Sequence, residues 1–181
     1  RCLSDWSSDV CSSDLSKRKT VVFQDAPVAF RLNELVVEIV RTLNAGARVI
    51  VVLNTVRRAV HLLRLLEADP RIASSAFFTC NGVIAPHHGR FAPADREVLD
   101  AAVSQCFGPG SSAGPRVLVG TQTLEQSLDI DADFMISDLA PADVLLQRIG
   151  RLHRHERNRP QGYETPARCV VITPPETLEA A

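Results

Sequence analysis

Apolar residues along the chain alternate between two spacings, one typical of strands and one typical of helices. Residues 47–53 (ARVIVVL) form a continuous, largely β-branched run, which is typical of a strand buried on both faces. Residues 28–46 carry apolar side chains at helical spacing, which predicts an amphipathic helix that Gly46 ends. Strand and helix patterns that alternate in this way predict an α/β fold with a mainly parallel sheet flanked by helices.

The same two patterns assign elements to most of the chain from Lys17 onward. The expected strands are 20–24, 47–53, a short one near Val83 and Ile84, 116–120, 133–139 and 167–174. The expected helices are 28–46, 55–69 after a cap at Asn54 or Thr55, 93–106 and 141–152. Ligands of such sheets bind at the carboxyl ends of the strands, so we expect the functional site at that edge.

The two ends of the chain lie outside this pattern. Residues 1–16 repeat Ser-Asp pairs without core periodicity, and we expect them to be disordered or foreign to the domain, with a short interaction peptide as the alternative. The expected organisation is therefore a separate segment over 1–16, one domain over 17–175 and a tail over 176–181.

Charge and cysteine content exclude several classes of protein. The formal net charge is −1, which excludes a generally polybasic nucleic-acid coat, so any anion site must be local. The five cysteines are odd in number and form no CxxC pair, which favours a reducing, cytoplasmic location over a disulfide framework. No apolar run reaches the roughly 20 residues of a membrane span, so we expect no membrane partner.

Small polar residues follow several of the expected strands. They are Asn54 and Thr55, His88 and Gly89, and Thr121. Free backbone N–H groups and helix dipoles at such junctions suit phosphate oxygens, and several such places on one edge favour an extended polyanion as ligand. Ordinary helix capping is the alternative at each place.

The stretch QRIGRLHRHERNRP (147–160) concentrates five arginines and two histidines. If the preceding helix continues through it, Arg148, Arg151 and Arg154 fall near one face, where two arginines one turn apart would reach one γ-phosphate. The alternative is a solvated basic helix end. The histidines lack a third ligand at a suitable spacing, so no metal site is expected.

Four segments in this order resemble elements of superfamily 2 helicases, on the second of their RecA-like domains. They are VIVVLNTVRRA (49–59), HGRFAPADR (88–96), TQTLEQSLDID (121–131) and QRIGRLHR (147–154), the last two being similar to motifs V and VI. The longer run 127–155 is similar to the CRISPR-associated helicase–nucleases of type I interference systems. The resemblance implies a RecA-like fold, with another bacterial DEAD/DEAH-type helicase as the alternative family.

The resemblance also implies roles for individual residues at the ATP site. Arg151 and Arg154 would face the γ-phosphate as catalytic arginines, with Asp129 and Gln147 beside the same nucleotide. Arg148 would instead brace motif V. Beyond this motif, Arg157 and Arg159 are expected to be dispensable for turnover.

A second set of roles concerns the nucleic acid and its coupling to ATP. The residues implied to lie along a single strand are Asn54, Thr55, His88, Gly89 and Thr121. The residues implied to link the two sites are Glu125, Gln126 and Ser127. Asp131 and Asp138 are expected to be ordinary loop and strand-end residues.

The sequence contains no GxxxxGK[ST] loop and no DEAD or DEAH box. The resemblance therefore implies that ATP and Mg²⁺ also need the N-terminal RecA-like domain of the same protein, which would carry the Mg²⁺ ligands. Single-stranded DNA and a CRISPR RNA-guided surveillance complex are the further partners implied, in antiviral defence. A non-catalytic nucleic-acid-binding module is the alternative of a different class, and a solute-binding α/β domain would explain motif VI alone.

Overall fold

The computed structural model describes residues 20–25, 32–125 and 128–173. The strands are β1 (Val21–Asp25), β2 (Arg48–Val52), β3 (Thr79–Cys80), β4 (Val83–Ile84), β5 (Arg116–Gly120), β6 (Phe134–Asp138) and β7 (Ala167–Ile172). The helices are α1 (Leu32–Asn44), α2 (Val56–Glu67), α3 (Pro93–Phe107) and α4 (Ala142–Ile149), with short 3-10 turns η2 (Ser74–Ala76) and η3 (Gln122–Glu125). The expectations for 1–16 and 176–181 concern residues outside these ranges and stay predictions.

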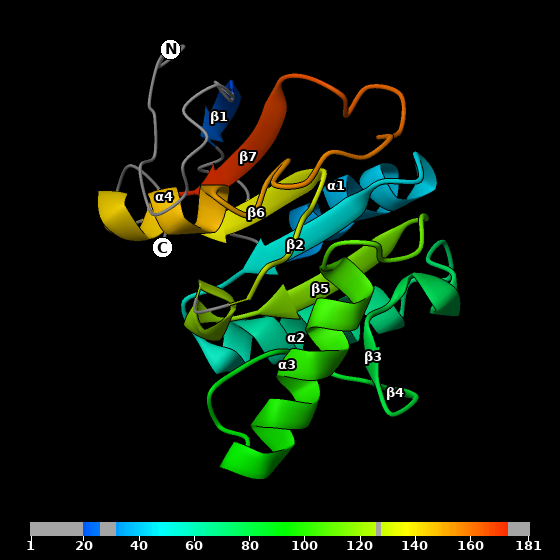
Figure 1. Ribbon diagram of the computed structural model, residues 1–181, viewed down its shortest axis with the longest axis vertical. Helices are drawn as coiled ribbons and strands as arrows, with labels where there is room; N and C mark the ends of the chain where they lie inside the picture. The colour runs from blue at the N-terminus through cyan, green and yellow to red at the C-terminus, as the bar shows by residue number, and fades with distance from the viewer. Residues whose placement is uncertain (1–19, 26–31, 126–127, 174–181) are drawn as a thin grey trace.

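Five of the strands form one parallel sheet in the order β1-β7-β6-β2-β5. The arrows of β2, β5, β6 and β7 point to the same side of the view in Figure 1, so their carboxyl ends share one edge. Every residue of β2 and β6 is buried, as their continuous apolar runs predicted. The predicted α/β fold with a mainly parallel sheet is confirmed.

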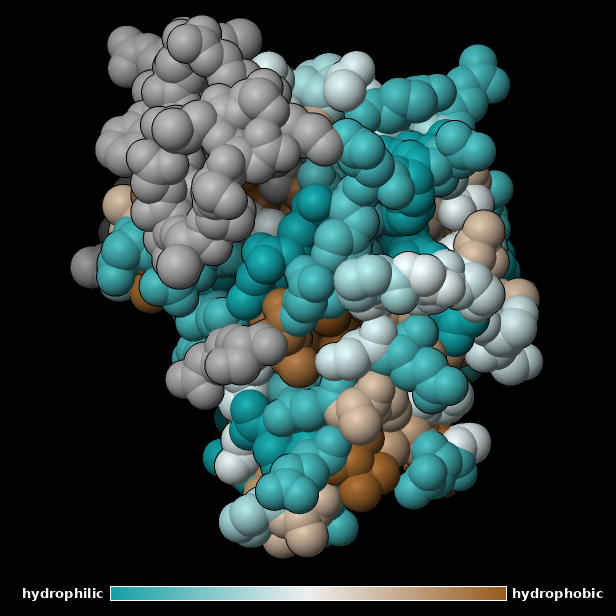
Figure 2. Space-filling view, viewed as in Figure 1, coloured by the Kyte–Doolittle hydropathy of each residue, from teal (hydrophilic) through white to brown (hydrophobic). Residues whose placement is uncertain are grey.

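Helices cover both faces of this sheet. On one face, α1 and α2 pack through residues such as Ile39 and Leu62. On the other face, Leu99 and Phe107 of α3 share a core with Leu152, from the turn after α4. In Figure 1, α3 lies in front of the sheet, whereas α1 and α2 lie behind it. Figure 2 shows this front side covered largely by hydrophilic residues, with apolar residues gathered over and beside α3.

The short strand expected near Val83 and Ile84 is present, but it does not join the main sheet. These residues form β4, which pairs antiparallel with β3 in a separate hairpin. Asn81 and Gly82, the two residues of its turn, both have positive φ, and an Asn-Gly pair favours this tight connection. The chain then runs beside β5, and His87 forms a parallel bridge with Gly120 at the carboxyl end of that strand.

The last helix is shorter than its apolar pattern predicted, because it ends at Ile149. Beyond Gly150, the backbone turns away and pairs with Ala132. The Ala132 N–H donates to the Arg151 carbonyl and the His153 N–H donates to the Ala132 carbonyl, both at 3.0 Å. This pairing satisfies the backbone outside the helix, so the common helical face expected for three arginines does not exist.

Candidate functional site

Arg148 organises the carboxyl edge of the sheet from a fully buried position, with 1% of its surface exposed. Its Nε and Nη2 both lie 2.7 Å from Oε1 of Glu125, at the end of η3. Its Nη1 donates to the Ser137 hydroxyl at 2.8 Å and to the Asp138 carbonyl at 3.0 Å, at the end of β6. Because a buried guanidinium is tolerated only when its charge and donors are paired, Arg148 is a structural brace of motif V, as expected.

Asn54 connects the end of β2 to the same brace. Its Oδ1 accepts a bond from Arg148 at 3.2 Å, and its backbone N–H donates to the Asp138 carboxylate at 2.7 Å. Thr55 is the N-cap of α2, and its hydroxyl accepts a bond from the Arg58 backbone N–H at 3.3 Å. Both residues therefore make bonds within the chain, and their contacts to phosphate stay a prediction.

Arg151 comes from the turn after α4 and is half-buried beside Glu125. One Nη donates to the Glu125 carbonyl at 3.0 Å, while its Nε is buried without a hydrogen-bond partner among the described residues. Burial lowers the pKa of Arg151 below its ordinary value, and the nearby charge of Arg154 lowers it further. A desolvated guanidinium with an unused donor is a group that an incoming phosphate oxygen would stabilise.

Asp129 and Arg154, both assigned to the nucleotide site by the resemblance, form an exposed ion pair. The Asp129 carboxylate accepts bonds from Arg154 Nε and, at 2.9 Å, from His155 Nε2. Burial raises the pKa of Asp129, but these two bonds outweigh it and hold the pKa below its ordinary value. Because the side chains of Asp129 and Arg154 are 54% and 42% exposed, the pair is of the kind that contributes little stability and can open.

Arg157 and Arg159 lie in a buried ion cluster at the amino end of β6. Arg157 contacts Asp131 at 2.6 Å and Asp133 at 2.8 Å, and Arg159 contacts the same two carboxylates at 3.0 and 2.8 Å. Both aspartates are 1% exposed, and Asp133 also accepts the backbone N–H of Arg48 at 2.8 Å. Asp131 is therefore a buried anchor rather than an ordinary loop residue. Its two arginines have structural contacts, and their expected dispensability for turnover stays a prediction.

Acidic residues of the chain itself neutralise most of the arginine-rich stretch. The pairs are Arg148 with Glu125, Arg154 with Asp129, and Arg157 and Arg159 with both Asp131 and Asp133. Within the described ranges, Arg151 alone of the five arginines makes no ion pair with a carboxylate. The stretch is thus not one basic patch, since its members are distributed from the carboxyl edge to the opposite end of β6.

His87 is a buried polar residue that sequence reasoning missed in favour of its neighbour. Its ring is 0% exposed, with Nδ1 2.7 Å from the Thr123 hydroxyl and Nε2 2.6 Å from the Asp100 carboxylate. Burial lowers its pKa, although Asp100 opposes the shift. A Cβ on Gly120 would come within 2.6 Å of the His87 carbonyl, so the glycine permits this close approach. The His-His pair was the available signal for a buried histidine, because successive residues of an extended segment point to opposite sides and one of the two therefore points inward.

The remaining predicted strand-path residues also lie at this edge. His88 stacks on Phe91 with ring centroids 4.4 Å apart, and the adjacent Gly89 is exposed. Thr121 is buried at the end of β5, where its N–H donates to the His87 carbonyl at 2.9 Å. The fold therefore brings the predicted residues from three segments together along the ends of β2 and β5.

Gln147 is exposed on the last turn of α4, one residue before the buried Arg148. Its expected contact with the nucleotide stays a prediction. Across residues 20–25, 32–125 and 128–173, no group of three His, Cys, Asp or Glu side chains is placed to hold a metal ion. No helix within those ranges is long and apolar enough to cross a membrane.

The ion cluster predicts a stability that depends on pH. Burial raises the pKa of Asp131, but bonds from Arg159 and Arg157 outweigh it and hold the pKa below its ordinary value. A carboxylate whose pKa is lower in the folded than in the unfolded protein stabilises the fold at pH values above its ordinary pKa of about 3.9. This contribution is lost as the pH falls through the lowered pKa. We expect the difference in melting temperature between the parent and Asp131→Asn to shrink steadily below about pH 4. A difference that stays constant down to acid unfolding would contradict the assignment.

The sheet order and the motifs at its edge define the class of this domain. It is the C-terminal RecA-like domain of a superfamily 2 helicase. A family model described as CRISPR-associated nuclease/helicase Cas3, C-terminal, matches residues 45–157, and the chain belongs to that family.

Similar proteins include Cas3 proteins of known sequence and structure. The CRISPR-associated endonuclease/helicase Cas3 of Escherichia coli K12 is 40% identical over 132 residues, which cover 71% of this chain and 14% of that protein. The T. fusca Cas3 structure with ATP is 29% identical with a TM-score of 0.72, covering 93% of this chain and 20% of that one. A chain of a CRISPR RNA-guided surveillance complex, pre-nicking, is 33% identical with a TM-score of 0.62, covering 88% and 19%. This chain thus spans a fifth or less of each relative.

Proposed function

We propose that the complete protein is an ATP-dependent helicase of CRISPR defence that acts on single-stranded DNA in the cytoplasm. In this proposal the described domain forms one wall of the ATP cleft and part of the strand path. The N-terminal RecA-like domain of the same protein supplies the phosphate loop and the Mg²⁺ ligands, and a CRISPR RNA-guided surveillance complex is the partner. The similarity to T. fusca Cas3 with ATP and to a chain of a surveillance complex supports these assignments.

The observation that carries the proposal is the state of Arg151. Its charge is desolvated, its Nε is buried without a hydrogen-bond partner, and it pairs with no carboxylate of the described residues. The γ-phosphate of ATP would provide the missing anion. Arg154 would join it after leaving the exposed Asp129 carboxylate, which would hold that arginine when the cleft is open. Gln147, exposed on α4, would complete the nucleotide contacts.

A continuous path of hydrogen bonds supports coupling between the ATP side and the strand side. Arg151 bonds to the Glu125 carbonyl, the Glu125 carboxylate pairs with Arg148, and Arg148 bonds to Asn54. This chain of hydrogen bonds ends at Asn54, where the proposed path of the nucleic-acid strand begins. The strand path consists of Asn54, Thr55, His88, Gly89 and Thr121. Glu125 thus fits the linking role, while Gln126 and Ser127 lie outside the described residues. Closure of the cleft on ATP would shift this brace and with it the strand contacts.

The division of labour between the two domains predicts where ATP turnover occurs. We expect the complete protein to hydrolyse ATP with stimulation by single-stranded DNA, and a fragment of residues 20–175 to fold without hydrolysing it. The reason is that the fragment's sequence holds no phosphate loop and no metal-binding carboxylate box. Phosphate release and circular dichroism are measured on both proteins. ATP turnover by the pure fragment, or ATP turnover by the complete protein that DNA does not stimulate, would refute the proposal.

A further inference from the structure

A separate groove with positive charge lies along the outer side of α2. Its lining consists of Val56, Arg57, Val60, His61 and Arg64 from the helix and Arg90 from the segment after β4. The three arginines and His61 are exposed, and no acidic residue of the described ranges lines the groove. The groove therefore presents basic side chains over an apolar floor, although the chain as a whole has a formal net charge of −1.

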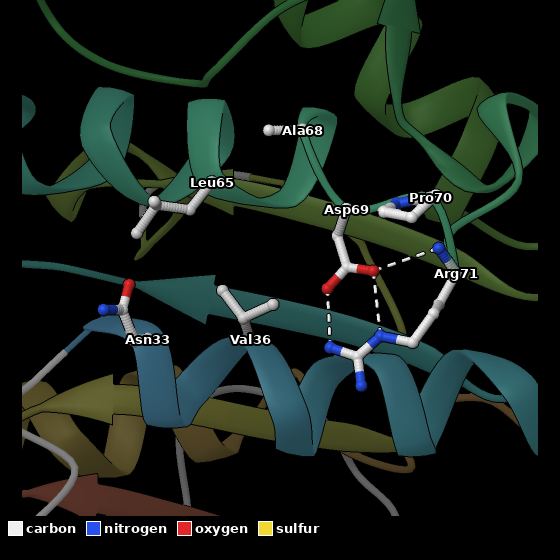
Figure 3. A pocket seen from close by; sticks show the side chains of 7 residues that line it. All are labelled: Asn33, Val36, Leu65, Ala68, Asp69, Pro70 and Arg71. Atoms are coloured by element: carbon white, nitrogen blue, oxygen red, sulfur yellow. Dashed lines mark hydrogen bonds and ion pairs between the residues drawn. The ribbon is translucent and has the colours of Figure 1, made fainter.

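The arginines of this groove lack the internal partners that other arginines of the domain have. Arg58, adjacent to Arg57 on the same helix, pairs with Asp138 at 3.1 Å. In a second groove, between α1 and α2, Arg71 is held by Asp69 through bonds of 2.9 and 2.6 Å (Figure 3).

By contrast, the side chains of Arg57, Arg64 and Arg90 make no hydrogen bond or ion pair with any residue of the described ranges. Like charges gathered without counterions repel one another, and a bound polyanion would relieve that repulsion.

The spacing of the basic side chains suits a phosphate backbone. Arg57, His61 and Arg64 follow one another at i, i+4 and i+7, so they lie along one face of α2. Seven residues of helix rise about 10 Å, so the basic side chains can reach more than one phosphate along a nucleic-acid strand. An acidic protein segment has no such fixed charge repeat, which favours nucleic acid as the occupant.

The groove also continues the strand path proposed above. Thr55 directly precedes the first groove residue of α2, and Arg90 directly follows His88 and Gly89. We infer that the groove binds the phosphate backbone of the same single strand, and so extends its path from the carboxyl edge of the sheet along α2. This inference rests on the proposed function, because it assumes that the edge itself binds the strand.

Salt-dependent binding tests the inference on the complete protein. The probe is a fluorescein-labelled oligothymidylate, and its affinity is measured by anisotropy over a series of salt concentrations. Each phosphate contact to a single strand contributes about 0.7 to the slope of log affinity against log salt. Arg57→Gln/Arg64→Gln should therefore lower the slope by about 1.4, and adding Arg90→Gln should bring the reduction to about 2. The matched control is Arg41→Gln/Arg71→Gln, which removes the same charge from arginines that have internal partners.

The outcomes separate the inference from the function on which it rests. The groove is supported as a strand site if the control variant has the same salt slope as the parent and the groove variants have slopes reduced by the stated amounts. If the groove variants have the same salt slope as the control while the parent still binds the oligonucleotide, the inference alone is overturned. The basic face would then be assigned to an acidic protein partner. A parent protein that binds no oligonucleotide at low salt overturns both the inference and the strand-binding part of the proposed function.

Discussion

Replacing Arg151 by alanine in the complete protein is expected to lower DNA-stimulated ATP turnover by about 10³- to 10⁵-fold, the range measured for arginine fingers. This corresponds to roughly 4 to 7 kcal/mol of transition-state stabilisation. Arg154→Ala should cause a loss of the same order, because both arginines are assigned to the transferred phosphoryl group. Neither change should unfold the domain, since the side chain of Arg151 bonds, among the described residues, only to one backbone carbonyl, and that of Arg154 pairs with an exposed carboxylate.

The control for this experiment comes from α1 rather than from the arginine-rich stretch. Arg41 is exposed and pairs with Glu38 on the surface of α1, so Arg41→Ala should cost under about 1 kcal/mol and leave turnover within a few-fold of the parent. Arg157 and Arg159 are unsuitable, because their loss would leave buried carboxylates unpaired. Turnover, melting temperature and strand affinity are measured for each variant. If Arg151→Ala matches Arg41→Ala in turnover, the arginine has no role at the γ-phosphate.

Asp131→Asn should produce the largest loss of stability among single substitutions at this site. The amide preserves the shape of the side chain but removes the charge that faces two guanidinium groups at a position 1% exposed. Breaking a buried ion pair from one side costs about 3–5 kcal/mol, and here two guanidinium groups would be left to share the single carboxylate of Asp133. With a shift of about 2–4 °C for each kcal/mol, the melting temperature should fall by roughly 6–20 °C.

An exposed aspartate provides the comparison. Asp95 lies in the first turn of α3, where a carboxylate contributes about 0.3–1 kcal/mol through the helix dipole, so Asp95→Asn should have a small effect. The double variant Asp131→Asn/Arg157→Gln should be less destabilised than the sum of its two single variants, because it removes both partners of one contact. A melting temperature for Asp131→Asn equal to that of Asp95→Asn would show that the cluster contributes no net stability.

The elements that the sequence predicted well are those whose signal is local. Residues 47–53 could be assigned to a buried strand, and 93–106 to a helix that begins at a proline, because burial and capping leave marks within one or two turns of chain. The hairpin at Asn81 and Gly82 also carried a local signal, which the apolar pattern around Val83 obscured. The candidate residues at the ends of β2 and β5 could be grouped in advance, since parallel strands place their carboxyl ends at one edge.

The end of α4 depended instead on a distant partner. The apolar pattern continues to Leu152, and that residue is indeed buried, but as part of an extended pairing with Ala132. A residue can be apolar and buried in either conformation, so periodicity could not decide between them. The interpretation of three arginines on one helical face failed for this reason.

The sequence by itself determined the order of strands and helices, the parallel sheet and the family, because each depends on residues close together in the chain or on a linear motif. Only the tertiary structure decided what each arginine of 147–160 contacts. Arg157 meets Asp131 across 26 positions of sequence, and Arg148 meets Asn54 across 94. Electrostatic pairing depends on distance and on exclusion of water, and both are set only when the strands and helices pack together. That packing pairs four of the arginines with carboxylates and leaves Arg151 as the one without such a partner among the described residues.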